Sequence, residues 1–549
     1  MEHLAVIRQQ NNLNTRTTTL WTKASGEYFT PETVGRRLVR DVLRLFARFQ
    51  KQSVSVIDPF CGDGRLLGWF LEELSVSAPH FRNLRWDIFL WDISAENVAA
   101  AQERVKAAIS SIGVEADVHA QVGDTFADAP SFPGQFDIVI TNPPWELIKP
   151  DKRDLNYLDP AEAEQYVQGL RSLGKRLSRD FPRSVPSRAF SGWGLNLSRV
   201  GLDVALSLLN PQGVAGIVMP ASFLADQTST ELRKCVFEEY SCRSISYYPA
   251  EARLFDRVDQ PFSVLTVQAG ELSQEPTTIT SYDKVLGVYS VAEVNLRADW
   301  IKQAGYCVPT SLLPGQIELL KIIQSHQQLG EMEKAAPTGL WIGRELDETG
   351  LELIVSRTGE RRLVKGRQVE RYRWREDYDP LYLRLDAVRS LPPSVQFARL
   401  VWRDVARPSQ KRRMHATVIP PGPVTGNSLG VLHNWQQETE RLFWHLGIVS
   451  SLAFEFQIRT LLRTGHISSG VVRRATVPGH IDEDTQQRIV RLVDKRLRGA
   501  ATVEPAIEVS VAQSYGLDKA AFAEVLGCFP KLEEAEKHVL LDDHLWVGH

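Results

Sequence analysis

Strand-like and helix-like segments alternate over about residues 35–220 of this 549-residue chain. Short apolar runs that suit buried strands precede amphipathic stretches that suit helices, as in VSVIDPF before LLGWFLEEL and DIFLWDI before AENVAAAQERVKAAI. This alternation is typical of a parallel, doubly wound sheet. Because PFSVLTVQAG reads as a late strand of the same sheet, we expect one α/β domain over residues 1–285.

The later part of the chain has a different composition and residue pattern. Between Arg357 and Arg413, basic residues outnumber acidic ones by about two to one and alternate with aromatic residues. Helical periodicity returns near the end of the chain. We therefore expect a connecting segment over residues 286–335, a mixed α+β domain over residues 336–480 and a helical segment over residues 481–549.

Composition restricts the class of protein. The chain is 43% hydrophobic and 24% charged, and it has no run of about 18 uncharged apolar residues that could span a bilayer. The first residues lack the pattern of a secretory signal. Five scattered cysteines form no CxxC pair, which predicts reduced thiols and no metal site. We expect a cytoplasmic monomer without a membrane partner.

Acidic residues stand at the ends of three successive predicted strands, at Asp58, Asp92 and Asp124. The first precedes a glycine-rich turn, where the backbone can come close to a ligand at the carboxyl edge of the sheet. A carboxylate at the second position can accept hydrogen bonds from both hydroxyls of a ribose, and one at the third can meet the adenine of the same cofactor. Each acid alone also suits a helix N-cap, but three in series favour a cofactor site.

The run Asn142-Pro143-Pro144-Trp145 follows the fourth predicted strand. Two prolines stiffen the turn, which leaves the Asn142 side-chain oxygen and the Pro143 carbonyl able to face one point as acceptors. An amino group bonded to both would present its nitrogen lone pair to a methyl donor. Trp145 offers an aromatic face on which a flat base can stack. A rigid proline turn beside a buried tryptophan is the structural alternative.

In this order the motifs resemble those of the gamma class of adenine-N6 DNA methyltransferases, found in type II restriction-modification systems. Those enzymes begin with a segment like residues 25–32, which covers the methionine part of the cofactor, and place a target-recognition domain after the catalytic one. The resemblance implies a Rossmann-like methyltransferase fold with a predominantly parallel sheet. Trp145 departs from the Tyr or Phe that often ends the family's motif, which leaves the fit of the base pocket open.

The resemblance also implies a reaction and partners. S-adenosyl-L-methionine would donate a methyl group to the N6 amino group of an adenine flipped out of double-stranded DNA. Such methylation protects host DNA in restriction-modification or related defence systems. A cognate restriction endonuclease or another defence-system subunit is therefore a further candidate partner.

Individual residues take roles from the same resemblance. The catalytic residues would be Asn142, Pro143, Pro144 and Trp145. The cofactor would contact Tyr28, Thr30, Pro31, Asp58, Pro59, Gly62, Gly64, Asp92, Ile93, Asp124 and Asn142. Phe255 would form the second wall of the base pocket opposite Trp145, with Phe262 as the alternative, although either could be a core residue.

DNA contacts are predicted from charge. Basic residues among aromatic ones can neutralise phosphates, and the candidates are Lys365, Arg367, Arg371 and Arg373. A second basic cluster lies at residues 411–413, and Asn427 is a weaker candidate. A solvated basic face without a partner is the alternative.

Other functions stay open at this point. Cytosine-N4 methylation uses similar acceptor geometry, although asparagine at the first motif position favours adenine by analogy. Cytosine-C5 methylation needs a Pro-Cys pair, and the sequence has none. Methyltransferases of protein glutamine or ribosomal RNA also use an Asn-Pro-Pro-aromatic motif but usually lack a large basic domain downstream. A non-catalytic DNA-recognition subunit that retains the fold is the alternative from another class.

Overall fold

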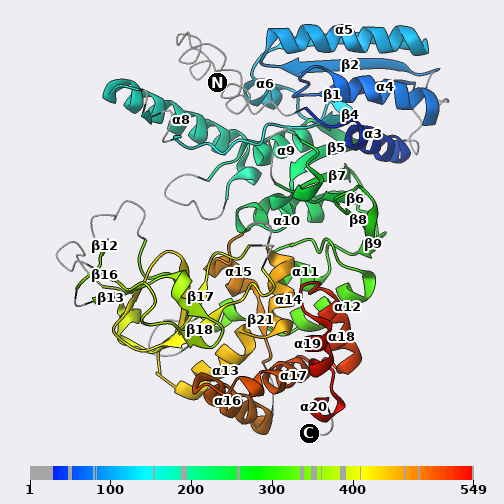
Figure 1. The fold of residues 1–549 in the computed structure, drawn as a ribbon. Helices are drawn as coiled ribbons and strands as arrows, with labels where there is room; N and C mark the ends of the chain where they lie inside the picture. Colours follow the sequence, from blue (N-terminus) through cyan, green and yellow to red (C-terminus); the bar gives the residue numbers. More distant parts are fainter. Residues whose placement is uncertain are drawn as a thin grey trace. The chain divides into compact units, whose positions relative to one another are not determined.

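A computed structural model of the chain describes residues 29–46, 52–77, 81, 83–151, 155–156, 158–186, 194–255, 260–333, 339–347, 355–359, 361–383, 391–407, 410–462, 465–479 and 482–546. The chain folds into two compact units (Figure 1). Unit 1 comprises Met1–Ala298 and Tyr306–Ser311, and unit 2 comprises Asp299–Gly305 and Leu312–His549. Among the described helices, none has the length and apolar character needed to cross a membrane.

A nine-stranded sheet forms the centre of unit 1, in the order β3-β2-β1-β4-β5-β7-β6-β8-β9. Its strands are β1 (Ser53–Asp58), β2 (Arg85–Asp92), β3 (Glu115–Val122), β4 (Phe136–Thr141), β5 (Leu209–Pro220), β6 (Ser241–Tyr248), β7 (Phe262–Gln268), β8 (Thr277–Tyr282) and β9 (Val288–Val294). Strands β1 to β5 pair in parallel, and β7 runs antiparallel between β5 and β6. The sheet continues past residue 285, where the sequence pattern placed the end of the domain.

Several helices pack against the sheet or against one another through apolar faces. The helices of unit 1 are α3 (Glu32–Phe46), α4 (Arg65–Ser77), α5 (Ala95–Ile112), α6 (Thr125–Asp128), α8 (Pro160–Asp180), α9 (Leu197–Leu208) and α10 (Thr230–Glu239). In α3 the buried residues Leu38, Val42 and Phe46 recur every four positions, which places them on one face. Helix α3 packs against α4, and α4 packs against α5 (Figure 1). Their apolar faces and the central strands form one core.

Unit 2 combines small sheets with a helical C-terminal region. One sheet contains β11 (Leu340–Gly343), β20 (Leu429–Asn434), β17 (Arg399–Arg403) and β18 (Ala416–Ile419), and a second contains β12 (Val355–Ser356), β16 (Leu381–Leu383), β13 (Arg361–Val364) and β19 (Val424–Thr425). Two-stranded sheets pair β10 (Gln327–Gln328) with β21 (Thr476–Val477) and β14 (Val369–Glu370) with β15 (Arg373–Trp374).

The helices of unit 2 are α11 (Asp299–Gln303), α12 (Pro314–Gln324), α13 (Thr439–Val449), α14 (Leu452–Leu461), α15 (Ser469–Arg474), α16 (Glu483–Leu497), α17 (Glu504–Ser514), α18 (Lys519–Gly527), α19 (Glu534–Leu540) and α20 (Asp543–Trp546). The mostly parallel sheet of unit 1 and this helical C-terminal region confirm the fold class predicted from the sequence.

A buried ion-pair network joins the strand-rich part of unit 2 to its helices. Glu508 of α17 is 3% exposed, and its Oε1 accepts hydrogen bonds from Arg371 Nη2 at 2.9 Å and Arg412 Nη1 at 3.0 Å. Glu455 of α14 is fully buried and accepts from Arg412 Nε at 2.9 Å. The Ser450 carbonyl accepts from both arginines. Arg371 also pairs with Glu504, and Glu455 also pairs with Arg459, so the network extends beyond these four side chains.

This network predicts that Glu508→Ala lowers the free energy of unfolding of unit 2 by about 3–5 kcal/mol, because two nearly buried guanidinium groups lose a partner. Glu508→Gln keeps two acceptor contacts and should lose less. Glu534→Ala is the matched control, since the Glu534 side chain is 78% exposed and pairs with Lys537 on its own helix. Urea unfolding followed by the circular dichroism of the helices measures the difference. An equal effect of Glu508→Ala and Glu534→Ala would contradict the role of the network.

Candidate active site

A glycine turn follows β1 and leads into α4. It contacts the carboxyl end of the neighbouring strand β2. Gly62 and Gly64 adopt φ angles of 49° and 76°, a region that favours glycine. A Cβ atom on Gly64 would lie 2.6 Å from the Ala101 Cα of α5, so the turn and this helix require glycine there. The Gly62 amide donates to Asp92 Oδ2 at 3.0 Å. The structure therefore brings the turn and Asp92 together.

Asp92 also organises the start of α5. Its Oδ1 accepts from the Ser94 amide at 2.9 Å, and Ser94 is the N-cap of α5. The side chain is only half-buried and a carboxylate has about four acceptor positions, so it can take further donors. The neighbouring Ile93 is 45% exposed, an apolar side chain at the tip of the strand. A polar acceptor beside an exposed apolar surface suits a nucleoside.

Asp58 ends β1 in a buried position. The residue is 1% exposed, and its Oδ1 accepts from the Phe60 amide at 3.1 Å. Burial raises the pKa of Asp58 to about 7, although the side chain of Thr141 and the Phe60 amide, which interact with the carboxylate, act in the opposite direction. A buried carboxylate suits a cationic group, which would offset its desolvation.

The segment before α3 covers the glycine turn. The Phe29 ring lies against Gly62, and the Arg65 guanidinium lies 4.3 Å from the centre of that ring. Thr30 is buried, and the Pro31 carbonyl accepts from the first amides of α3. Phe29 is 42% exposed, so its ring faces both the turn and solvent. Tyr28, also predicted to contact the cofactor, lies outside the described residues.

Asp124 lies just beyond β3 and is held by two donors. Its Oδ1 accepts from the Phe126 amide at 3.1 Å, which makes it the N-cap of α6. Its Oδ2 accepts from Arg176 Nη2 of α8 at 2.8 Å. Sequence analysis did not single out Arg176, because it belongs to no motif and only the fold brings α8 to this strand end.

The Asn142-Pro143-Pro144-Trp145 motif is fixed by packing on both sides. Pro143 lies so close to α9 that a Cβ atom on Gly201 would overlap its ring. After the motif, the Leu197 amide donates to the Glu146 carbonyl at 2.7 Å. The preceding strand β4 is buried along its whole length. Asn142 is therefore presented from a rigid turn at the same sheet edge as Asp58.

The predicted aromatic pair lies in contact. The ring centres of Trp145 and Phe255 are 5.0 Å apart with 59° between the planes, and Phe262 lies 6.3 Å from Trp145 and 4.9 Å from Phe255. Trp145 and Phe255 are 9% and 5% exposed. A base stacked between two rings needs their planes about 7 Å apart, twice the contact distance of carbon atoms. One of the two rings must therefore move before a base can lie between them.

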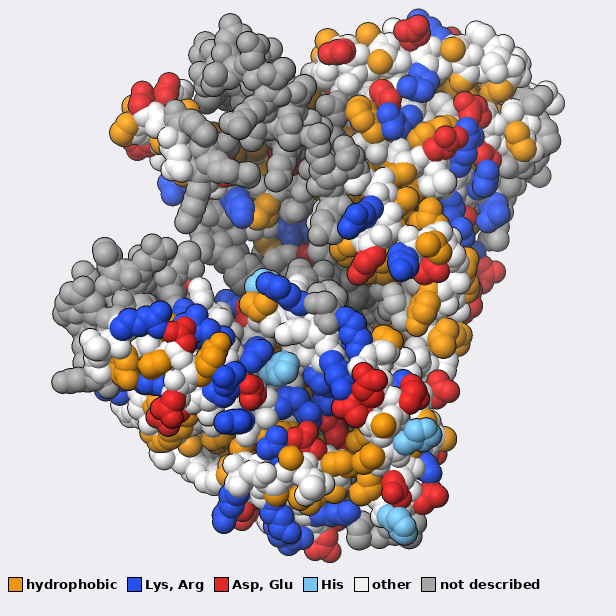
Figure 2. Space-filling view, viewed as in Figure 1, with side chains coloured by type: hydrophobic (Ala, Val, Ile, Leu, Met, Phe, Trp, Pro, Cys, Tyr) orange, Lys and Arg blue, Asp and Glu red, His pale blue; other side chains and the backbone are white. Residues whose placement is uncertain are grey.

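The predicted DNA-binding residues of unit 2 have different surroundings. Arg371 is bound by the acids of α17 and is only 17% exposed. Arg367 is half-exposed and forms an ion pair with Asp379. Lys365 is partly buried, and burial lowers its pKa. Arg373 is exposed and forms no ion pair with any residue that the structure describes. Figure 2 shows many basic side chains on the viewed face of unit 2, with acidic ones among them.

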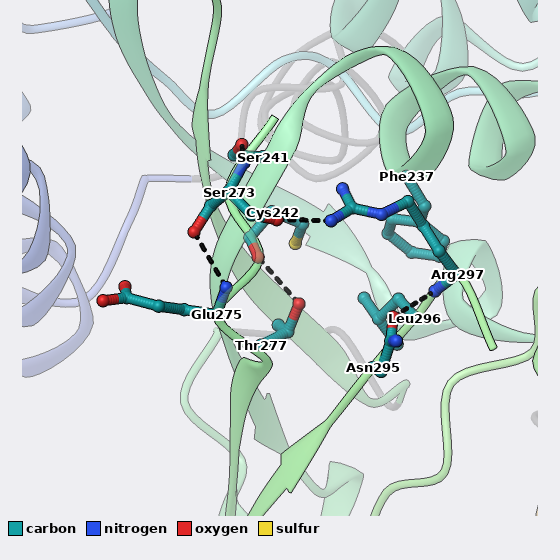
Figure 3. Close-up of a pocket in the computed structure, with 9 residues that line it drawn as sticks. All are labelled: Phe237, Ser241, Cys242, Ser273, Glu275, Thr277, Asn295, Leu296 and Arg297. Carbon is teal, nitrogen blue, oxygen red and sulfur yellow. Dashed lines mark hydrogen bonds between the residues drawn. The ribbon is translucent and has the colours of Figure 1, made fainter. Parts of the chain in front are cut away.

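A small cavity in unit 1 lies away from this site (Figure 3). It has a volume of about 20 Å³ and is lined near the start of β6 by polar groups such as Ser241, Ser273 and Thr277. Tyr248, at the other end of β6, stacks on Phe262 of the aromatic cluster. The length of the strand separates the two by roughly 23 Å. The cavity has room for about one water molecule and lies at the opposite end of β6 from the aromatic cluster.

Comparison with known proteins finds a family match for the first part of the chain and similar folds among solved structures. The profile of the family described as N-6 DNA Methylase matches residues 14–163. No curated protein matches the sequence. Among solved structures, the cryo-EM structure of the DrdV–DNA complex is similar with a TM-score of 0.52 and 10% identity over 87% of this chain and 58% of that chain. The ATP-dependent Type ISP restriction-modification enzyme LlaBIII bound to DNA is similar with a TM-score of 0.50 and 10% identity over 90% and 40% of the respective chains.

The chain thus spans 58% and 40% of the length of these two proteins, and at this identity the similarity is one of fold. Residues 14–163 include the glycine turn, all three strand-end acids and the Asn142 motif. This part of the chain carries the sequence pattern of the N-6 DNA Methylase family, and the chain adopts a fold shared with a restriction-modification enzyme.

Proposed function

We propose that the chain is a DNA methyltransferase of the gamma class, which transfers a methyl group from S-adenosyl-L-methionine to the N6 amino group of adenine. The observation that carries the proposal is the position of the Asn142 motif beside the acidic strand ends. Strands β1 and β4 are parallel neighbours, and adjacent strands lie about 4.8 Å apart. Asp58 at the end of β1 and Asn142 just after β4 therefore lie at adjacent strand ends, so an acceptor site would border a cofactor site.

The residues around the glycine turn fit S-adenosyl-L-methionine. Asp92 would accept from the ribose hydroxyls, and the exposed Ile93 would lie against the adenine. The buried carboxylate of Asp58 would face the ammonium group of the methionine part. Phe29 and the Thr30-Pro31 segment would cover this part of the site. The bound cofactor supplies a methyl group already activated by its sulfonium.

The acceptor residues align the amino group of the base. Asn142 Oδ1 and the Pro143 carbonyl would accept its two hydrogens, which directs the nitrogen lone pair toward the methyl donor. Both oxygens also stabilise the positive charge that develops on this nitrogen during transfer. Because stacking hides the base in a duplex, the adenine must be flipped out. Trp145 and Phe255 would then separate to receive it.

Unit 2 would supply target recognition. Arg373 and Arg367 are the exposed members of the predicted basic run and would contact phosphates, whereas Arg371 stabilises the unit from within. We propose that the methylation protects DNA in a restriction-modification or related defence system, with an endonuclease as partner. The similarity of the fold to that of a restriction-modification enzyme bound to DNA supports this proposal.

The proposal predicts that Asn142→Ala lowers the rate of methyl transfer to DNA by about 100-fold or more, because an acceptor that stabilises developing charge is lost. Affinity for S-adenosylhomocysteine should stay within a few-fold, since Asn142 would meet the base. Transfer of a radiolabelled methyl group and calorimetry measure the two quantities. Asn295→Ala, in an exposed turn after β9, is the control and should change neither. Activity of the Asn142 variant above about a tenth of wild type would exclude the assigned role.

A second prediction concerns pH. Because the pKa of Asp58 is about 7, this carboxyl group is mostly neutral at pH 6 and mostly ionised at pH 8. Only the ionised form attracts the ammonium group of the ligand. Affinity for S-adenosylhomocysteine should therefore rise about tenfold from pH 6 to pH 8, which is the ratio of the two ionised fractions. Asp58→Asn should bind more weakly at pH 8 and lose this dependence. A wild-type affinity that falls over the same interval would contradict the assignment.

A further inference from the structure

The chain leaves the sheet edge just after the Asn142 motif and returns to the same edge before α9. We call the segment between these two points, residues 149–194, the excursion. The Ile148 amide donates to the Leu195 carbonyl at 2.9 Å, and the Leu197 amide donates to the Glu146 carbonyl at 2.7 Å. Helix α8 belongs to the excursion between these pinned ends (Figure 1). The two ends of the segment that contains α8 are thus joined beside the candidate acceptor site.

The C-terminal end of α8 packs at the tip of β3. Leu177 is fully buried, and the rings of Phe181 and Phe126 meet edge to face with centres 6.5 Å apart. Arg176 lies within this packed end and reaches Asp124 Oδ2. The side chains of Arg176 and Asp124 are 32% and 23% exposed, so the ion pair lies at the border between packed surface and solvent.

We propose that Arg176 is a positioning residue for the adenine part of the cofactor, and that it acts through Asp124. The inference rests on the proposed function. The Phe126 amide holds one carboxylate oxygen and Arg176 holds the other, so together they fix the plane of the carboxylate. Each oxygen keeps a second lone pair. The fixed carboxylate can therefore accept a hydrogen bond from the 6-amino group of the cofactor's adenine.

If the ion pair between Arg176 and Asp124 only docked α8, the effect of removing it on ligand binding would differ. A docking role would change stability, or would change the binding of every ligand at this site alike. A positioning role through Asp124 changes the binding of ligands that carry the 6-amino donor and spares those that lack it. The two roles are therefore separated by a pair of ligands that differ in this group alone.

The test is calorimetry with S-adenosylhomocysteine and with its analogue in which hydrogen replaces the 6-amino group. Arg176→Ala should weaken S-adenosylhomocysteine binding by about two- to fivefold, the range for a partly exposed ion pair, and leave the analogue unchanged. Arg176→Lys should recover part of the loss. Arg179→Ala is the control, since Arg179 lies on the same helix, is 77% exposed and pairs with Asp180; it should change neither affinity.

A double variant tests the route through Asp124. In an Asp124→Asn background, Arg176→Ala should have little further effect, because the carboxylate that it positions is gone. Equal weakening of both ligands, an unchanged affinity for S-adenosylhomocysteine, or additive losses in the double variant would overturn the inference while leaving the proposed cofactor in place. Failure of the wild-type protein to bind S-adenosylhomocysteine at all would overturn the proposed function, and this inference with it.

Discussion

The parallel pairing of β1 with β2 on one side and β4 on the other determines where Asp58, Asp92 and Asn142 lie. Parallel strands end at the same edge of a sheet, so residues far apart in the sequence converge there. Asp58 and Asp92 end two of these strands, and Asn142 directly follows the third. Packing then sets the detail, since Gly64 lets the turn approach α5 and Gly201 lets Pro143 approach α9.

Much of this arrangement is predictable from the sequence because it depends on local pattern. Strand and helix periodicity predicts the sheet, and the acids and glycines mark its carboxyl edge. Contacts between distant side chains leave no such pattern. Arg371 lies in a basic, aromatic run that favours DNA binding, yet its partner Glu508 lies 137 residues away on another element. The same holds for Arg176, whose contact with Asp124 depends on how α8 folds back.

The aromatic cluster has the residues of a base pocket in place but does not yet have room for a base. Trp145 and Phe255 lie together, as a base pocket would need, but their rings fill the space that a base would take. Both are nearly buried, so separating them costs apolar contacts. Stacking against an extruded base returns about 1–3 kcal/mol per base, which offsets that cost. In the proposed reaction, opening of the pocket and flipping of the base are therefore linked events.

The central claim is the chemical identity of the methylated atom. The most direct measurement is nucleoside analysis by mass spectrometry of duplex DNA incubated with the protein and S-adenosyl-L-methionine. The proposed alignment of an adenine amino group by Asn142 and Pro143 predicts N6-methyladenine and no methylated cytosine. N4-methylcytosine in its place would contradict the assignment of the base and leave the fold intact, and DNA without any methylated nucleoside would contradict the proposed activity itself.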